Sequence, residues 1–114
     1  MDQTRLQKVS RLLQKDMGDI LQKEANDLFF GALITITQVK VSPDLSIARL
    51  YVSIFPLHNK SVDFIFKLLN EKKALLRMRL AARVKNQLRI IPQISFFIDD
   101  SLDYLENIDR LLKK

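Results

Sequence analysis

Two neighbouring strand-forming segments, separated by a short proline turn, constrain the fold of this chain most strongly. Residues 33–41 and 46–55 are rich in β-branched and aromatic side chains, which favour extended backbone. Between them, the sequence Ser-Pro-Asp-Leu at residues 42–45 is typical of a tight turn, because proline presets φ at its second position. One face of the second segment is apolar and comprises Ala48, Leu50, Val52 and Ile54. We therefore expect an antiparallel hairpin.

Three further segments have helical periodicity. Residues 4–25 carry apolar side chains at three- to four-residue spacing, and Thr4 is a suitable N-cap. A second helix is expected at residues 61–69, with Ser61 as its cap, and a third at residues 74–88. The apolar ridge of the third helix repeats every four residues, at Leu76, Leu80, Val84 and Leu88.

The C-terminal part of the chain predicts one more strand and a short helix. Residues 94–98 alternate between apolar and other side chains after Pro92, which indicates a third strand, and residues 101–114 have helical spacing. The predicted order is α-β-β-α-α-β with a C-terminal helix, in a single domain spanning residues 1–114. This order predicts an α+β fold in which helices cover one face of a three-stranded sheet.

The sequence offers no residue set for catalysis or for binding a metal or cofactor. There is no cysteine, and a lone loop histidine, His58, is more often structural or solvated than catalytic. The only glycines, Gly18 and Gly31, cannot form a phosphate-cradling loop. The carboxylates of residues 99–109 lack the glycine-containing spacing of a calcium loop, so they fit a solvated face better. We expect a non-enzymatic protein without cofactor or metal.

Hydropathy argues against a membrane protein. No apolar run approaches the ~20 residues that cross a bilayer, and the first residues lack the apolar core of a secretion signal. We expect a cytoplasmic protein without a membrane partner.

Positive charge is concentrated in one region of this chain, whose formal net charge is +6. From Lys72 to Ile98 there is no Asp or Glu. The cations of this acid-free stretch are Lys72, Lys73, Arg77, Arg79, Arg83, Lys85 and Arg89. Exposed helices usually mix charges and form i,i+4 ion pairs, so the stretch favours a polyanionic partner, for which nucleic acid is the commonest intracellular choice. In one alternative the cations only keep the helices soluble, and in another a protein docks on exposed apolar positions such as Phe29 and Phe30.

Three aromatic residues on the predicted strands are candidates for stacking on bases. They are Tyr51, Phe55 and Phe97. Buried or half-buried positions are more typical of at least the two phenylalanines.

Several segments resemble the bacterial ribosome-binding factor A family over essentially the whole chain. They are Ile34–Val39, Val41–Ser53, Leu68–Asn70, Leu75–Arg77, Pro92–Phe96 and Asp99–Tyr104. The resemblance implies a type-II KH-like domain and a non-enzymatic assembly factor. Such a factor binds the small ribosomal subunit and its rRNA during late maturation and rRNA processing, and it leaves before translation. In this family it also implies a role in cold adaptation in some bacteria and a maturation GTPase as a further partner. We expect a monomer.

The resemblance also implies a bend between the second and third helices. The family carries an Ala-x-Gly element there, in place of the GxxG loop of ordinary KH domains. In an ungapped register the element falls on Lys72, Lys73 and Ala74, with alanine where glycine is usual. A gapped register would instead place the element at residues 74–76. We expect no function that depends on the long charged tail of some family members.

Carried onto this sequence, the RNA-facing surface includes the bend and the third helix. The first expected contacts are Lys72, Lys73, Arg77, Arg79 and Arg83, followed by Lys85 and Arg89. A second cluster on the first helix comprises Arg5, Lys8 and Arg11. Contacts with phosphate and sugar are expected from these side chains, which supply affinity rather than sequence choice.

Overall fold

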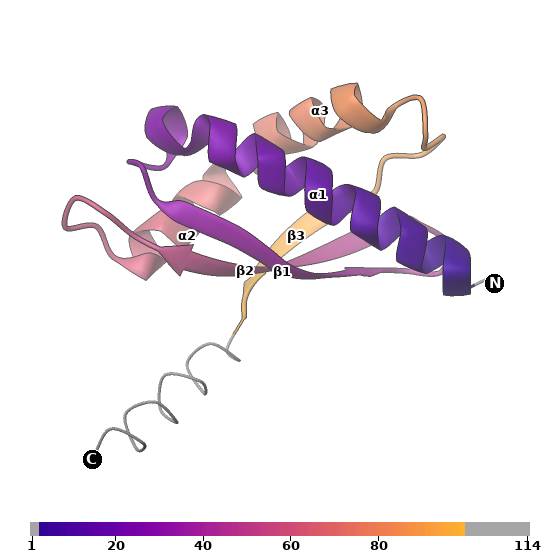
Figure 1. Cartoon of the computed structure of the whole chain (residues 1–114), viewed down its shortest axis with the longest axis horizontal. Helices are drawn as coiled ribbons and strands as arrows, with labels where there is room; N and C mark the ends of the chain where they lie inside the picture. Colours follow the sequence, from indigo (N-terminus) through magenta and orange to yellow (C-terminus); the bar gives the residue numbers. More distant parts are fainter. Residues whose placement is uncertain (1–2, 100–114) are drawn as a thin grey trace, which may run out of the picture.

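All helices of the described chain lie on the same side of a three-stranded sheet (Figure 1). The computed structural model describes residues 3–99. Its elements are α1 (Gln3–Leu28), β1 (Leu33–Val41), β2 (Ile47–Phe55), α2 (Val62–Glu71), α3 (Lys73–Val84) and β3 (Gln93–Ile98). This order confirms the predicted α+β, KH-like arrangement. The predicted helix at residues 101–114 lies outside the described part of the chain.

The sheet has β2 as its central strand. β1 pairs with β2 as the predicted antiparallel hairpin, and the amide of Leu45 donates to the carbonyl oxygen of Ser42 at 2.9 Å to close the turn. β3 pairs with the other edge of β2 in parallel. A parallel neighbour requires a crossover connection, and α2 and α3 supply it on the covered face of the sheet.

The apolar side chains of the helices and strands point toward each other and form one core between the helices and the sheet. The predicted inward face of β2 is buried at Ala48, Leu50 and Val52, each 0% exposed. The ridge of α3 is equally buried at Leu76, Leu80 and Val84. α1 contributes Val9, Leu13, Met17, Ile20 and Leu21. Removing each leucine-sized side chain from water stabilises the fold by about 1.5–3 kcal/mol.

A bulge in β1 changes which residues face the core. The pairing with β2 shifts between Ile36 and Gln38, so Thr37 is the extra residue. Ile36 and Val39 are therefore both buried, although three positions separate them. The Thr37 hydroxyl lies within hydrogen-bond reach of the Tyr51 carbonyl oxygen, at 3.2 Å, and of the Asp99 carboxylate.

The ends of α1 and α2 test three predictions. Ser61 caps α2 as predicted, since its hydroxyl accepts from the Phe64 amide at 3.0 Å. The prediction for Thr4 was wrong, because α1 already includes Gln3 and Thr4 lies inside its first turn. α1 also continues to Leu28, beyond the predicted end at residue 25. Gly31 follows the helix with φ +76°, a conformation that glycine adopts readily. In this conformation its amide donates to the Ala25 carbonyl oxygen at 2.8 Å.

The third helix is shorter than its apolar spacing predicted. α3 ends at Val84, whose carbonyl oxygen accepts from the amides of both Gln87 and Leu88 at 2.9 Å. Leu88 packs against the core from the following connection rather than from the helix. Lys85 therefore lies in a turn, so its predicted helical position was wrong, and Arg89 lies in the loop that leads to β3.

Candidate nucleic-acid interface

The junction of α2 and α3 is a single residue, Lys72. Its backbone angles, φ −95° and ψ 9°, are open to any L-residue, so the bend needs no glycine. The Lys72 amide donates to the Leu68 carbonyl oxygen, and the Lys72 carbonyl oxygen accepts from the Leu76 amide, both at 2.9 Å. The break between the two helices thus falls at Lys72, the first residue of the element in the ungapped register. Lys73 begins α3, and Ala74 lies in its first turn.

Lys72 and Lys73 are half-buried and have no ion-pair partner within residues 3–99. Lys73 lines a cavity of about 560 Å³ between this junction and the start of β3. The other lining residues are Asn70, Glu71, Ala74, Arg77, Gln93, Ile94 and Ser95. Two cations, Lys73 and Arg77, therefore border one open cavity at the junction, together with the Glu71 carboxylate and neutral polar groups.

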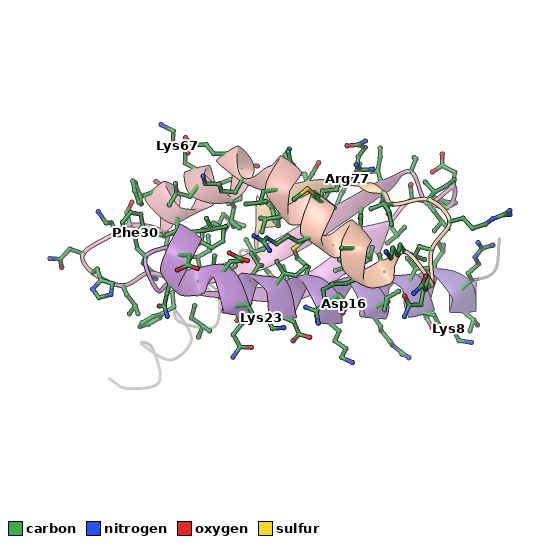
Figure 2. The ribbon with its side chains drawn as sticks, turned by 90° about the horizontal axis from the view of Figure 1, so that it is seen from above. Lys8, Asp16, Lys23, Phe30, Lys67 and Arg77 are labelled. Atoms are coloured by element: carbon green, nitrogen blue, oxygen red, sulfur yellow. The ribbon has the colours of Figure 1, made fainter. Side chains whose placement is uncertain are left out.

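The Arg77 side chain forms hydrogen bonds that stabilise the fold. Its Nε donates to the Pro92 carbonyl oxygen at 3.0 Å, and its Nη2 donates to the Ile91 carbonyl oxygen at 2.7 Å. Arg77 is half-buried and points from α3 toward the connection to β3 (Figure 2). The two hydrogen bonds of the guanidinium group therefore attach α3 to the segment that immediately precedes β3.

Carboxylates of α1 neutralise part of the positive charge of the acid-free stretch. Arg79 Nε lies 3.2 Å from Glu24 Oε1. Arg83 lies between two carboxylates, with Nε 3.4 Å from Asp16 Oδ1 and Nη2 3.3 Å from Asp19 Oδ2. For these two arginines, carboxylates of another helix therefore supply the compensation that the stretch lacks locally in sequence. The sequence could not reveal these pairs, because they join residues on different helices.

Three other predicted cations meet at one place. Arg5 and Lys8 from α1 and Arg89 from the loop after α3 line a cavity of about 440 Å³. We call these three residues the basic cluster. All three are exposed, and none of their side chains has an ion-pair partner among the described residues. The sequence placed Arg5 and Lys8 in one group and Arg89 in another, and the fold brings them together.

Asp44 is the one acidic residue that lines the same cavity. Hydrogen bonds from the hydroxyls of Ser46 and Ser42 hold the pKa of the Asp44 carboxyl below its usual value. Its oxygen Oδ1 accepts from Ser46 Oγ at 2.7 Å and from Ser42 Oγ at 2.8 Å. The carboxylate thus stays ionised at neutral pH and is already engaged in the β1–β2 turn.

The remaining predicted contacts, Arg11 and Lys85, are exposed and lie outside the lining of this cavity. His58 is exposed in the loop after β2, at φ +57°. Within the described residues, no group of three or more His, Cys, Asp or Glu side chains could hold a metal ion. In the same part of the chain, no helix is both long and apolar enough to cross a membrane.

Reversing the charge of Arg83 is expected to destabilise the fold. In Arg83→Glu a third carboxylate would face Asp16 and Asp19, so the free energy of unfolding should fall by about 1–2 kcal/mol at low salt. Urea titration measures this loss, and added salt at about 1 M should shrink it by screening. Lys85→Glu makes the same charge change next to α3 without an acidic neighbour and should cost under about 0.5 kcal/mol. Equal losses in the two variants would show that the α1–α3 ion pairs contribute nothing.

A family model described as "Ribosome-binding factor A" matches residues 5–112 of the chain. Two relatives with this name match it along nearly its whole length. The relative from Christiangramia forsetii is 43% identical over 115 residues, which cover 99% of this chain and 86% of the relative. The relative from Cytophaga hutchinsonii is 44% identical over 114 residues, covering 100% of this chain and 84% of the relative.

One crystal structure and one homology model fitted into a cryo-EM map share the fold. The crystal structure of ribosome-binding factor A from Thermus thermophilus superposes with a TM-score of 0.67 at 22% identity, over 82% of this chain and 94% of that one. A homology model of the Thermus thermophilus factor, fitted into the cryo-EM map of its complex with the 30S subunit, gives a TM-score of 0.60 at 26% identity. That similarity covers 78% of this chain and 89% of the fitted one.

Proposed function

This chain belongs to the ribosome-binding factor A family, and we propose that it binds the small ribosomal subunit through its rRNA during late maturation. In this proposal it is a non-enzymatic assembly factor in the cytoplasm. It acts as a monomer that holds maturing rRNA, supports rRNA processing and growth in the cold, and leaves with the help of a GTPase. The Thermus thermophilus relative fitted into a 30S complex supports the choice of subunit.

The basic cluster is the observation that carries the proposal. Arg5, Lys8 and Arg89 surround one cavity, and no protein carboxylate forms an ion pair with them within residues 3–99. Cations in this state favour phosphate groups, because each phosphate contact releases counterions from the RNA. We propose that these residues contribute most to RNA binding, and that Lys72 and Lys73 at the junction contribute less. Arg77, Arg79 and Arg83 act mainly in holding the fold together.

Co-sedimentation with small ribosomal subunits across a salt series tests this assignment. Removing two phosphate contacts with Lys8→Ala and Arg89→Ala should weaken binding and flatten the log–log salt dependence by about two units. The matched control is Lys23→Ala with Lys67→Ala, which removes the same charge away from the cluster. Figure 2 shows Lys8 near one end of the molecule and Lys67 near the other.

Two results would contradict the proposal. Absence of salt-sensitive binding to small subunits by the folded wild-type protein would refute the proposed partner. Equal salt slopes for the cluster variant and its control would refute the basic cluster as the contact surface.

A protein-interaction module is the second candidate, and one aromatic group favours it. The rings of Phe30 and Phe64 lie 5.6 Å apart between centroids, and Lys60 Nζ lies 4.7 Å and 5.0 Å from the two centroids. Phe30 is 45% exposed, whereas Phe29, the other predicted docking position, is buried and was wrongly predicted to be exposed. If this group docks a protein, binding should vary little with salt and should be lost in Phe30→Ala.

A further inference from the structure

Figure 1 shows that the described helices leave one face of the sheet open. This face carries a pair of aromatic side chains. Tyr51 of β2 and Phe97 of β3 are register partners. Their ring centroids lie 5.5 Å apart, with an angle of 28° between the planes. Phe97 is 41% exposed and Tyr51 is half-buried, so Phe97 is more exposed than the buried or half-buried position predicted for it. An exposed stacked pair on a sheet offers an aromatic surface to a planar group.

Two cations lie beside this aromatic pair. Lys40 and Arg49 are directly opposite each other in the β1–β2 register, and both are exposed. Lys40 Nζ lies 5.5 Å from the centroid of the Tyr51 ring. The two cations border a cavity of about 280 Å³, together with Val41, Ser42, Pro43 and Ile47. Neither side chain has an ion-pair partner within residues 3–99.

The position of Lys40 and Arg49 favours an anion. Like charges directly opposite each other on neighbouring strands destabilise a sheet, and a bound anion would remove this repulsion. The turn beside this cavity holds the Asp44 carboxylate, which already accepts hydrogen bonds from the Ser42 and Ser46 hydroxyls. Among residues 3–99, no carboxylate forms an ion pair with Lys40 or Arg49, so a ligand can supply the anion between them.

This cavity and the cavity of the basic cluster share one lining residue. Pro43 lines both the cavity between Lys40 and Arg49 and the cavity of the basic cluster. The β1–β2 turn thus separates two groups of cations, one on the helical side and one on the open face. A polyanionic strand held by the basic cluster can pass over the turn at Pro43 and reach the open face.

We propose that the open face binds a segment of single-stranded RNA, with a base stacked on Phe97 and Tyr51 and a backbone phosphate between Lys40 and Arg49. Every nucleobase has a face that stacks on aromatic rings, and cations beside such rings follow the phosphate backbone. An apolar protein segment would cover the aromatic pair but would leave the two facing cations without an anion. The inference rests on the proposed function, because it gives the RNA partner a second contact surface.

Fluorescence of Tyr51 provides a direct probe. The sequence has two tyrosines and no tryptophan, so Tyr104→Phe leaves Tyr51 as the only strong emitter in the full chain. Titration of this protein with a single-stranded oligoadenylate of about twelve nucleotides at low salt should quench its emission. Phe97→Ala should weaken binding by about tenfold or more, because it removes one of the stacked rings. The control is Leu33→Ala, which is 61% exposed on β1 and lies outside the cation-lined cavity.

Each outcome of the titration is decisive. Quenching that Phe97→Ala weakens and Leu33→Ala leaves unchanged supports the site. Binding that is insensitive to Phe97→Ala but lost with Lys8→Ala and Arg89→Ala overturns it, since the basic cluster would then hold RNA alone. Dimerisation of the wild type that Phe97→Ala abolishes, without quenching by RNA, would assign the face to a second copy of the chain. Co-sedimentation with small subunits separates the two proposals: salt-sensitive binding without quenching refutes only the open-face site.

Discussion

Replacing Leu80 by alanine is expected to lower the free energy of unfolding by about 2–5 kcal/mol. Leu80 is 0% exposed in the middle of α3, so its loss leaves a cavity that close packing cannot fill. A domain of this size is stable by only about 5–15 kcal/mol, so the variant loses a large share of its stability. Urea titration measures the loss directly, and Tm should fall by roughly 8–20 °C. Val52→Ala, at another fully buried position, should cost about 2–4 kcal/mol.

Met78→Ala is the matched control on the same helix. Met78 is 62% exposed, so its truncation should change stability by less than about 0.5 kcal/mol. Equal losses in Leu80→Ala and Met78→Ala would contradict the orientation of α3 on the sheet.

Replacing Arg77 by methionine is expected to cost about 2–3 kcal/mol of stability. The change keeps much of the side chain's volume but removes both donors to the carbonyl oxygens of Ile91 and Pro92. Hydrogen bonds from a charged donor are worth about 1.5–3 kcal/mol each, and partial exposure of this site lowers their sum. Urea titration of the purified variant measures the effect without any RNA.

Arg79→Met is the control for Arg77, because it removes the same charge from the same helix. Arg79 forms an exposed ion pair with Glu24, and such pairs are worth about 0–1 kcal/mol. If Arg77→Met were as stable as wild type but impaired in subunit binding, Arg77 would contact RNA and the structural role assigned to it would be wrong.

Local sequence patterns predict the helices and strands well. Buried side chains recur every second residue in a strand and every three to four residues in a helix. The alternation along residues 46–55 and the four-residue ridge from Leu76 to Val84 each match the buried face that the structure shows. The boundaries were less predictable. Leu88 continues the apolar spacing of α3, but it reaches the core from the connection that leads to Pro92 and β3.

The candidate site was predicted only in part, because charge compensation depends on tertiary packing. Arg83 and Asp19 are 64 residues apart in sequence, so no local pattern could pair them. The convergence of Arg89 with the start of α1 likewise depends on where the connection after α3 passes α1 and the β1–β2 turn. The outward orientation of Arg49 could have been found from strand alternation, since its neighbours Ala48 and Leu50 are buried. That of Lys40 could not, because the bulge at Thr37 reverses the alternation along β1.

The central position of β2 has a consequence for biosynthesis. β1 can pair with β2 once residue 55 has been made, but the strand that fills the other edge of β2 ends at residue 98. At roughly 5–20 residues per second, translation of residues 56–98 takes about 2–9 s. During that interval the nascent hairpin exposes an unpaired edge that can pair with another chain. A ribosome that stalls before residue 93 would therefore release a fragment prone to aggregation.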